Sequence, residues 1–432
     1  MNEAAPLPIS GEPVEAQKFI PVSRSDIVAA LLAPDYWNGE QERALAASVF
    51  NKIGCLRQHK SAVMLNELSD VYDPFNPDDE TVNQYKFSDA EKLEQRRVFN
   101  DRLKALITGA NYKELTDAGL AEVLTNASPD GVHVEVDFSE FEVKLIFYRG
   151  EGEMHRSKRD IRWAYLKRIE YVVPIYKRLF LALKFKPEDV RVSELMAHHG
   201  INEEKARKRL KKIRKMLPSY VLTDHIYLKI FKNIPRYDVE MLFPNIRVKM
   251  KYSDKVQLGG SALAGTITYA LGTATKLLVA VALSPVMLAV ALASGFGGIV
   301  YAQVRNIFIT RDRYRMQLAQ SLYFQNLANN QGALAVIVDD AEEEDVKEEV
   351  LLYAHLLGGP FHASQLDALG GHISNFLRDK FDVDVQFDVH DALERLMANQ
   401  MIRQSSTGEL HVMALSDADR HLHNRWCRLV EC

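Results

Sequence analysis

The residues best suited to chemistry form an acidic run, DDAEEEDVKEEV, between Asp339 and Val350. Glu344 and Glu348 stand one helical turn apart, and His355 follows seven residues later on a similar face. Carboxylate-bridged metals in helical bundles are held by Glu-x-x-His pairs on facing helices. The sequence has no second pair of this kind. The pattern therefore favours a solvated acidic helix over a metal site.

Other groups that could carry chemistry are isolated. The acidic loop Asp70–Glu80 has two prolines and no central glycine, so a solvated turn is favoured over a calcium loop. His198 and His199 have no nearby cysteines, and the three cysteines form no CxxC pair. The sequence also lacks GxxxxGK[ST], HExxH and GxSxG. These observations favour a non-enzymatic protein and predict no metal and no cofactor.

A basic stretch follows a segment that resembles the start of a helix-turn-helix, with Gly200 at its turn. Three interpretations stay open, and a solvated face paired with Glu203 and Glu204 is the favoured one. An anionic lipid surface comes second, because each basic residue near such a surface contributes about 1 kcal/mol. Nucleic acid comes last, because groups that read bases are few. The candidate lipid-surface residues are Lys205, Lys208, Lys211, Lys212 and Lys215.

The elements that position these residues belong to a chain of 432 residues, long enough for two or three domains. The formal net charge is -4, which argues against a preference of the whole chain for nucleic acid. The N-terminal residues have no apolar stretch of the kind found in signal peptides. Any membrane anchor is therefore expected inside the chain.

The most apolar segment is Val256–Val304, in which Lys276 is the only charged residue. A membrane span needs roughly 20 apolar residues, so this segment is long enough for two. Lys276 is expected at the turn, because a lysine at the bilayer centre is costly. The sequence thus predicts a two-helix transmembrane hairpin, with a buried hairpin in a soluble protein as the alternative.

Basic residues flank this segment on both sides, which is typical of a hairpin with both termini in the cytoplasm. Small residues four apart, such as Ser261 and Gly265, would allow close helix packing or self-association. The lipid bilayer is therefore a predicted partner. The flanking residues are Arg247, Lys249, Lys251 and Lys255 before the segment, and Arg305, Arg311, Arg313 and Arg315 after it.

The residues before the hairpin predict a disordered lead over 1–18 and an α+β domain over 19–250. Helical patterns occur at about 40–70 and 88–126. Alternating or β-branched residues then predict strands at His133–Phe138, Phe141–Tyr148 and Arg168–Lys184, with Pro174 marking an edge or a break. The expected product is a small antiparallel sheet with helices.

After the hairpin, residues 305–345 predict a helical connector and 346–432 a winged-helix-like domain. Helices are expected at about 346–357, 363–379 and 388–399, before a β-hairpin at Ile402–Met413. From Asp345 onward there are eight basic and fourteen acidic residues. DNA binding by counterion release needs the opposite charge, so a protein-binding winged helix is expected. The helix that would enter a groove carries Asp388, Asp391 and Glu394.

Four stretches resemble a family of membrane proteins grouped as domain of unknown function 3754. They are Phe19–Val22, Leu228–Pro244, Leu322–Asn330 and Glu344–Leu352. The resemblance implies a two-span membrane protein with a helical, winged-helix-like C-terminal part. The family occurs in bacteria, plants and animal mitochondria, and it brings no established activity or catalytic residues. Without a transit peptide, the sequence favours a bacterial inner-membrane protein.

The sequence as a whole therefore predicts an α+β membrane protein that acts as a scaffold or adaptor. Its soluble domains are expected in the cytoplasm, with the C-terminal domain binding a protein partner and with no binding to nucleic acid. Two alternatives remain. One is an oligomeric channel or transport component built from the hairpins, and the other is an enzyme of unrecognised type at the membrane surface.

Overall fold

The computed structural model describes residues 18–78, 87–125, 132–159, 168–215, 217, 221–244, 246–250 and 322–430. These residues form helices and antiparallel sheets, which confirms the predicted α+β class with an antiparallel sheet. The chain divides into two compact units. Unit 1 comprises Met1–Glu114, Phe147–Glu151 and Ala328–Cys432, and unit 2 comprises Leu115–Ile146 and Gly152–Leu327.

Among the described residues, no helix combines the length and the apolar character needed to cross a membrane. Helices α2 (Glu40–Tyr72) and α9 (Asn330–Leu356) are long enough, at 33 and 27 residues, but both carry many charged residues. This finding corrects the predicted fold class and localisation, and the transmembrane hairpin and the integral-membrane placement are withdrawn. The segment assigned to the hairpin, Val256–Val304, lies outside the described residues.

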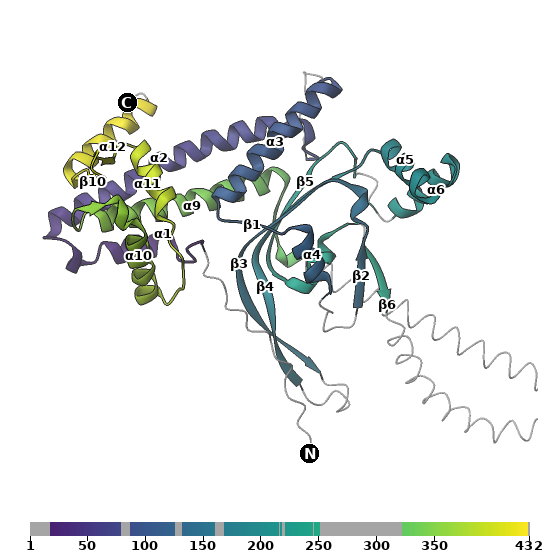
Figure 1. The fold of residues 1–432 in the computed structure, drawn as a ribbon, viewed down its shortest axis with the longest axis horizontal. Coiled ribbons are helices and arrows are strands. Elements are labelled where there is room, and N and C mark those ends of the chain that lie inside the picture. Colours follow the sequence, from purple (N-terminus) through teal and green to yellow (C-terminus); the bar gives the residue numbers. More distant parts are fainter. Residues whose placement is uncertain are drawn as a thin grey trace, which may run out of the picture. The chain divides into compact units, whose positions relative to one another are not determined.

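Unit 1 is organised around helix α9 (Figure 1). Helices α1, α2, α3, α10 and α11 all pack against it, and α2 also contacts α12. The two short helices η1 and η2 follow α1 and α2. The bounds are α1 Arg24–Leu31, η1 Pro34–Tyr36, η2 Asp73–Phe75, α3 Asp89–Gly109, α10 Leu366–Phe381, α11 Val389–Ala398 and α12 Leu415–Val430.

Local side-chain contacts fix where the N-terminal helices begin. Ser23 caps α1 by accepting a hydrogen bond from the backbone N–H of Asp26. Ser88 and Glu91 form a reciprocal capping box at the start of α3. Each cap satisfies backbone donors that the first helical turn leaves without partners.

The C-terminal elements of unit 1 combine helices with three short strands. After α9 come β8 (Phe361–His362), η6 (Ala363–Gln365), α10, α11, β9 (Ile402–Gln404) and β10 (Glu409–Val412). The three strands form an antiparallel sheet in the order β8-β10-β9. Gly408 closes the β9–β10 turn with φ +90, and a Cβ there would lie 2.6 Å from His362.

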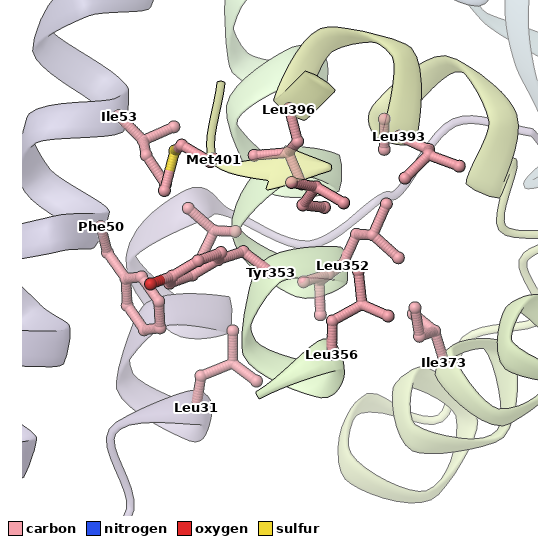
Figure 2. Close-up of a cluster of buried hydrophobic side chains, with 14 of the residues drawn as sticks. Leu31, Phe50, Ile53, Leu352, Tyr353, Leu356, Ile373, Leu393, Leu396 and Met401 are labelled. Carbon is pink, nitrogen blue, oxygen red and sulfur yellow. The ribbon is translucent and has the colours of Figure 1, made fainter. Parts of the chain in front are cut away.

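One hydrophobic core joins these elements to the N-terminal helices (Figure 2). Leu31 and Phe50 come from α1 and α2, Tyr353 comes from α9, and Ile373 and Leu396 come from α10 and α11. All five side chains are at most 4 % exposed. The core therefore draws on segments that the sequence assigned to an N-terminal and to a C-terminal domain.

Unit 2 contains the long antiparallel strands β3 (Phe141–Arg159), β4 (Arg168–Phe185) and β5 (Tyr227–Pro235), of which β3 contributes its central residues to unit 1. Strand β4 pairs with β5 from Leu183 opposite Tyr227 to Ile175 opposite Pro235. Residues 179–183 of β4 are all buried, as expected for a strand covered on both faces. Pro174 does not break the strand, because it lies just beyond the last residue pair with β5.

Shorter elements complete the two units. Strands β2 and β6 form a separate antiparallel pair in unit 2, and β1 of unit 1 pairs with Phe147 and Tyr148 of β3. In unit 2 the aromatic ring of Phe243 contacts the rings of both Phe138 and Phe141. The bounds are β1 Lys113–Glu114, α4 Asp117–Thr125, β2 Val132–Val136, η3 Phe138–Glu140, α5 Glu188–His199, α6 Glu203–Arg214, η5 Arg236–Leu242, β6 Ile246–Met250 and β7 Asn326–Asn329.

Candidate functional site

The acidic run singled out from the sequence lies on α9, and most of its carboxylates are buried. Glu344, Glu348 and Glu349 are 2 %, 4 % and 1 % exposed. This corrects the expectation of a solvated acidic helix. An ionised carboxylate is costly to bury unless cations and donors surround it. The neighbouring helices and the N-terminal segment supply both.

Two arginines from other helices bind the carboxylates in the second half of the run. Arg57 of α2 and Arg395 of α11 each lie 3.2 Å from an oxygen of Asp345. Arg57 also pairs with Glu349, and Arg395 pairs with Glu348 and lies 3.5 Å from Glu349. These contacts tie α2 and α11 to the same turn of α9.

Carboxylates in the first half of the run are bound in the same way. Arg149 lies 2.7 Å from one oxygen of Asp340, and the hydroxyl of Tyr112 donates to the other oxygen at 2.7 Å. Arg24 of α1 lies 3.0 Å from Glu342. We call the whole set the α9 network. It contains the carboxylates Asp340, Glu342, Glu344, Asp345, Glu348 and Glu349 and the cations Arg24, Arg57, Arg149, Lys347 and Arg395.

Glu344 and Lys347 pair with each other and hold the backbone of the N-terminal segment. The N–H of Ile20 donates to Glu344 at 2.9 Å, and the Lys347 ammonium donates to the carbonyl of Ile20 at 2.7 Å and to that of Val22 at 3.3 Å. Ile20 itself is 1 % exposed. The guanidinium of Arg149 lies 5.1 Å from the ring centre of Phe19. Residues 19–22 are therefore held against α9 by one buried ion pair, and we call this contact the latch.

Six carboxylates face five cations in the α9 network, and burial raises the pKa of several acids. It raises the pKa of Glu344 and Glu349 despite the nearby Lys347 and Arg57. Burial lowers the pKa of Arg395, but attraction by its three carboxylate neighbours outweighs this effect and raises the pKa above its ordinary value. Burial and repulsion by Glu344 outweigh the attraction of Arg395 and raise the pKa of Glu348 to about 7.

This raised pKa predicts that unit 1 loses stability as the pH rises. Between about pH 4.3, the ordinary value for Glu, and about pH 7, folded Glu348 keeps a proton that the unfolded chain releases. The proton held by Glu348 therefore stabilises the folded state fully below this pH interval. As the pH rises through the interval, this contribution to the free energy of unfolding decreases by about 3 kcal/mol. Glu348→Gln should therefore flatten the pH dependence, measured by hydrogen exchange in α9. Exposed Glu94→Gln is the control, and an unchanged slope in Glu348→Gln would contradict the assignment.

Within the described residues, no group of three or more His, Cys, Asp or Glu side chains is arranged to hold a metal ion. Glu348 accepts from Asn111 at 3.2 Å as well as from Arg395, and His355 donates from Nδ1 to the carbonyl of Leu351 at 2.8 Å. Glu344, Glu348 and His355, the three residues considered as metal ligands from the sequence, thus each bind different partners. The α9 network connects helices and is suited to positioning them.

A cleft of about 1280 Å³ lies in unit 1 beside the C-terminal end of α9. Its walls come from η1, the start of α2, α10 and the start of α12. Tyr36 is half exposed and meets Phe376 edge to face, with ring centres 6.5 Å apart. Trp37 is fixed by a hydrogen bond from its indole N–H to the carbonyl of Leu31 at 2.9 Å. The aromatic wall of the cleft is therefore held in place by the core.

Polar groups share the cleft with these aromatic rings. His355 packs against His372 and Phe376, with ring centres 5.6 and 5.2 Å apart. Burial lowers the pKa of His355, so its ring is neutral at physiological pH. Its Nδ1 donates to a carbonyl, which leaves Nε2 as an acceptor. The carboxylates of Glu42 and Asp379 also line the cleft.

This cleft could not be predicted from the sequence. Tyr36 and Trp37 lie more than 300 residues before His355 and Phe376 in the chain. Only the shared core brings these residues together. The adjacent aromatic residues Tyr36 and Trp37 are a local signal, but by themselves they do not indicate a cleft.

The structure places the candidate lipid-surface lysines on or directly after α6, which is in unit 2. Lys205, Lys208, Lys211, Lys212 and Lys215 are all exposed. Arg247 and Lys249 belong to β6, of which the structure describes the backbone. The other membrane-flanking residues lie outside the described residues. They are Lys251, Lys255, Lys276, Arg305, Arg311, Arg313 and Arg315.

The fold and the α9 network define an α+β protein in which the C-terminal helices and strands of unit 1 share their core with N-terminal helices. Residues 145–332 match the sequence model of the family described as protein of unknown function (DUF3754). The match agrees with the family resemblance found in the sequence. No solved structure matches the chain.

Two of the four stretches that carry the resemblance, Leu228–Pro244 and Leu322–Asn330, lie inside the matched range. The other two, Phe19–Val22 and Glu344–Leu352, lie outside it and contact each other in unit 1. Their contact is the latch between Ile20 and the Glu344–Lys347 pair.

Proposed function

We propose that this protein is a non-enzymatic adaptor and that unit 1 binds a segment of a partner protein in the cleft beside α9. The observation that supports this proposal best is the cleft itself. Its volume of about 1280 Å³ exceeds the range of about 300–1,000 Å³ typical of sites for small ligands. Such a volume suits a peptide segment.

The lining of the cleft indicates what kind of segment would bind. Tyr36, Trp37 and Phe376 offer rigid aromatic surface, the kind that dominates the energetics of protein interfaces. Glu42 and Asp379 are both carboxylates, and Lys380, whose ammonium lies 5.9 Å from the ring centre of Tyr36, is the one lysine or arginine among the described residues that line the cleft. The expected partner segment carries an aromatic or large aliphatic side chain next to a lysine or arginine.

The charge of the winged-helix-like part supports a protein partner over DNA. In α11, His390, Asp391 and Glu394 are exposed, while Arg395 is turned toward the carboxylates of α9. The helix that would enter a DNA groove therefore presents carboxylates to the solvent. Phosphate binding requires lysine or arginine at that surface.

A selection of displayed random peptides on the purified full-length chain tests this proposal. We expect the enriched peptides to combine an aromatic or leucine side chain with a basic residue. Tyr36→Ala and Asp379→Lys should each weaken binding of a purified enriched peptide at least about tenfold, because they remove a contact surface and invert a charge. Both side chains are exposed, so folding should be unaffected.

Matched controls separate the cleft from the rest of the surface. Tyr323→Ala removes an exposed tyrosine in unit 2, and Asp391→Lys inverts an exposed charge on α11 outside the cleft. Both controls should bind the peptide like the unmodified chain. Enriched peptides that bind equally well to Tyr36→Ala and Asp379→Lys would refute binding in the cleft.

A further inference from the structure

Helices α5 and α6 form a helical hairpin in unit 2 that has a small core of its own. Gly200 ends α5 with φ +60, a left-handed conformation that glycine adopts without strain. Val192 and Leu195 of α5 then pack against Ala206 and Leu210 of α6, and all four are at most 3 % exposed. The opposite face of α6 is left open to the solvent.

A buried carboxylate fixes this hairpin to the rest of unit 2. Glu140 is 1 % exposed and accepts from Arg191 of α5 at 2.6 Å and from Arg214 of α6 at 3.1 Å. Arg214 also donates to the carbonyl of Lys186 at 2.9 Å, and its guanidinium lies 6.0 Å from the ring centre of Phe185. Because both helices are held at one residue, the exposed face of α6 is a fixed surface.

That exposed face carries a line of basic side chains, which we call the α6 stripe. Successive members are three residues apart, except for the adjacent Lys208 and Arg209, so all of them lie on one side of the helix. All are exposed, and Lys208 pairs with Glu204 at 2.7 Å. The other members have no ion pair within 4.0 Å among the described residues. The α6 stripe consists of Lys205, Lys208, Arg209, Lys212 and Lys215.

We propose that the α6 stripe docks on an anionic lipid surface and binds the phosphate and carboxylate groups of lipid headgroups. Five cations over the length of one helix, about 15 Å, match a flat surface of negative charge. The contact is electrostatic and peripheral, and it requires no span of the bilayer.

The same residues argue against DNA as the ligand. A helix-turn-helix reads bases with the first turn of its second helix, while its first helix crosses the phosphate backbone. In this hairpin, Glu203 and Glu204 occupy the first turn of α6, and Glu188 and Asp189 occupy the first turn of α5. These carboxylates would face phosphates in a groove. On a flat surface the α6 stripe can make contact without Glu188, Asp189 and Glu203, which pair with Arg207 outside the stripe, while Glu204 stays paired with Lys208.

Sedimentation of the full-length chain with vesicles tests the proposal. One vesicle population is phosphatidylcholine alone, and the other contains about one third phosphatidylserine. We expect the anionic vesicles to bind more protein, and this excess should shrink as salt rises to about 0.15 M, where exposed charges are screened beyond about 8 Å. Each basic residue near an anionic surface strengthens partitioning about fivefold. Replacing Lys205, Arg209, Lys212 and Lys215 with Gln should therefore reduce the excess at least about tenfold.

A control variant with the same change in net charge distinguishes the α6 stripe from a general charge effect. It replaces four exposed basic residues of unit 1 with Gln, namely Lys60, Arg97, Arg403 and Arg428. This control should keep most of the excess binding. Glu204→Gln, which releases Lys208 from its ion pair, should increase the binding to anionic vesicles.

Three outcomes would overturn the proposal. The first is equal binding of the unmodified chain to neutral and anionic vesicles. The second is equal loss of binding in the stripe variant and in the control variant. The third is tighter binding to duplex DNA than to anionic vesicles, with the stripe variant losing the DNA binding, because the stripe would then be a nucleic-acid surface.

Discussion

Arg395→Met is expected to destabilise unit 1 by about 3–5 kcal/mol, the cost of removing one partner from a buried ion pair. The Arg395 side chain is 19 % exposed and contacts Glu348, Asp345 and Glu349. Methionine fills much of the same volume but offers no charge. Arg57 alone would then have to balance Asp345 and Glu349, and Glu348 would keep only the amide of Asn111.

Hydrogen exchange in α9 measures this loss, because its slowest amides report the free energy of opening unit 1. Arg403→Met, an exposed substitution on β9, is the control and should change stability by less than about 0.5 kcal/mol. Combining Arg395→Met with Glu348→Gln should recover part of the loss, since a carboxylate without its cation is then removed. A loss below about 1 kcal/mol in Arg395→Met would show that the α9 network does not depend on this residue.

The burial of the acidic run shows what the sequence could not reveal. The helix at Glu344–Leu352 was predictable from local residues, but its partners are distant in the chain. Arg57 and Glu349 are separated by 292 residues, and Ile20 and Glu344 by 324. A local pattern of carboxylates is the same whether water or arginine surrounds it. The solvated interpretation therefore followed from composition and was wrong.

Elements defined by nearby residues were easier to predict. Strand β4 is indicated by its density of β-branched and aromatic residues, and the helix pair is indicated by the turn at Gly200, so both can be read from nearby residues. The transmembrane hairpin and the integral-membrane localisation rested on the apolar length of Val256–Val304 and on the basic residues that flank it. Among the described residues no helix could span a membrane, and both are corrected.

The contact between Phe19–Val22 and α9 gives a structural role to two of the stretches that resemble the family. Ile20 is buried in the core of unit 1, while its backbone N–H and carbonyl bind Glu344 and Lys347. A short segment with no helix or strand of its own is thereby ordered through both its side chain and its backbone. The latch makes α9 the element on which the start of unit 1 depends.

Lys347→Met is expected to release this latch and to cost about 3–5 kcal/mol, because it leaves the buried Glu344 carboxylate without its cation. It also removes the donor to the carbonyls of Ile20 and Val22. Residues 19–22 should detach before the rest of unit 1 unfolds, since the core residues other than Ile20 keep their contacts with one another. Brief trypsin digestion of the full-length chain measures this detachment as faster cleavage after Arg24 in α1.

Two further variants distinguish loss of the latch from a general effect of removing a lysine. Lys60→Met removes an exposed lysine of α2 and should leave cleavage after Arg24 unchanged. Lys347→Met combined with Glu344→Gln should be cleaved more slowly than Lys347→Met alone, because no unpaired charge remains while the amide can still accept from the N–H of Ile20. Cleavage of Lys347→Met at the rate of the unmodified chain would show that Ile20 is held by its side chain in the core and not by the ion pair.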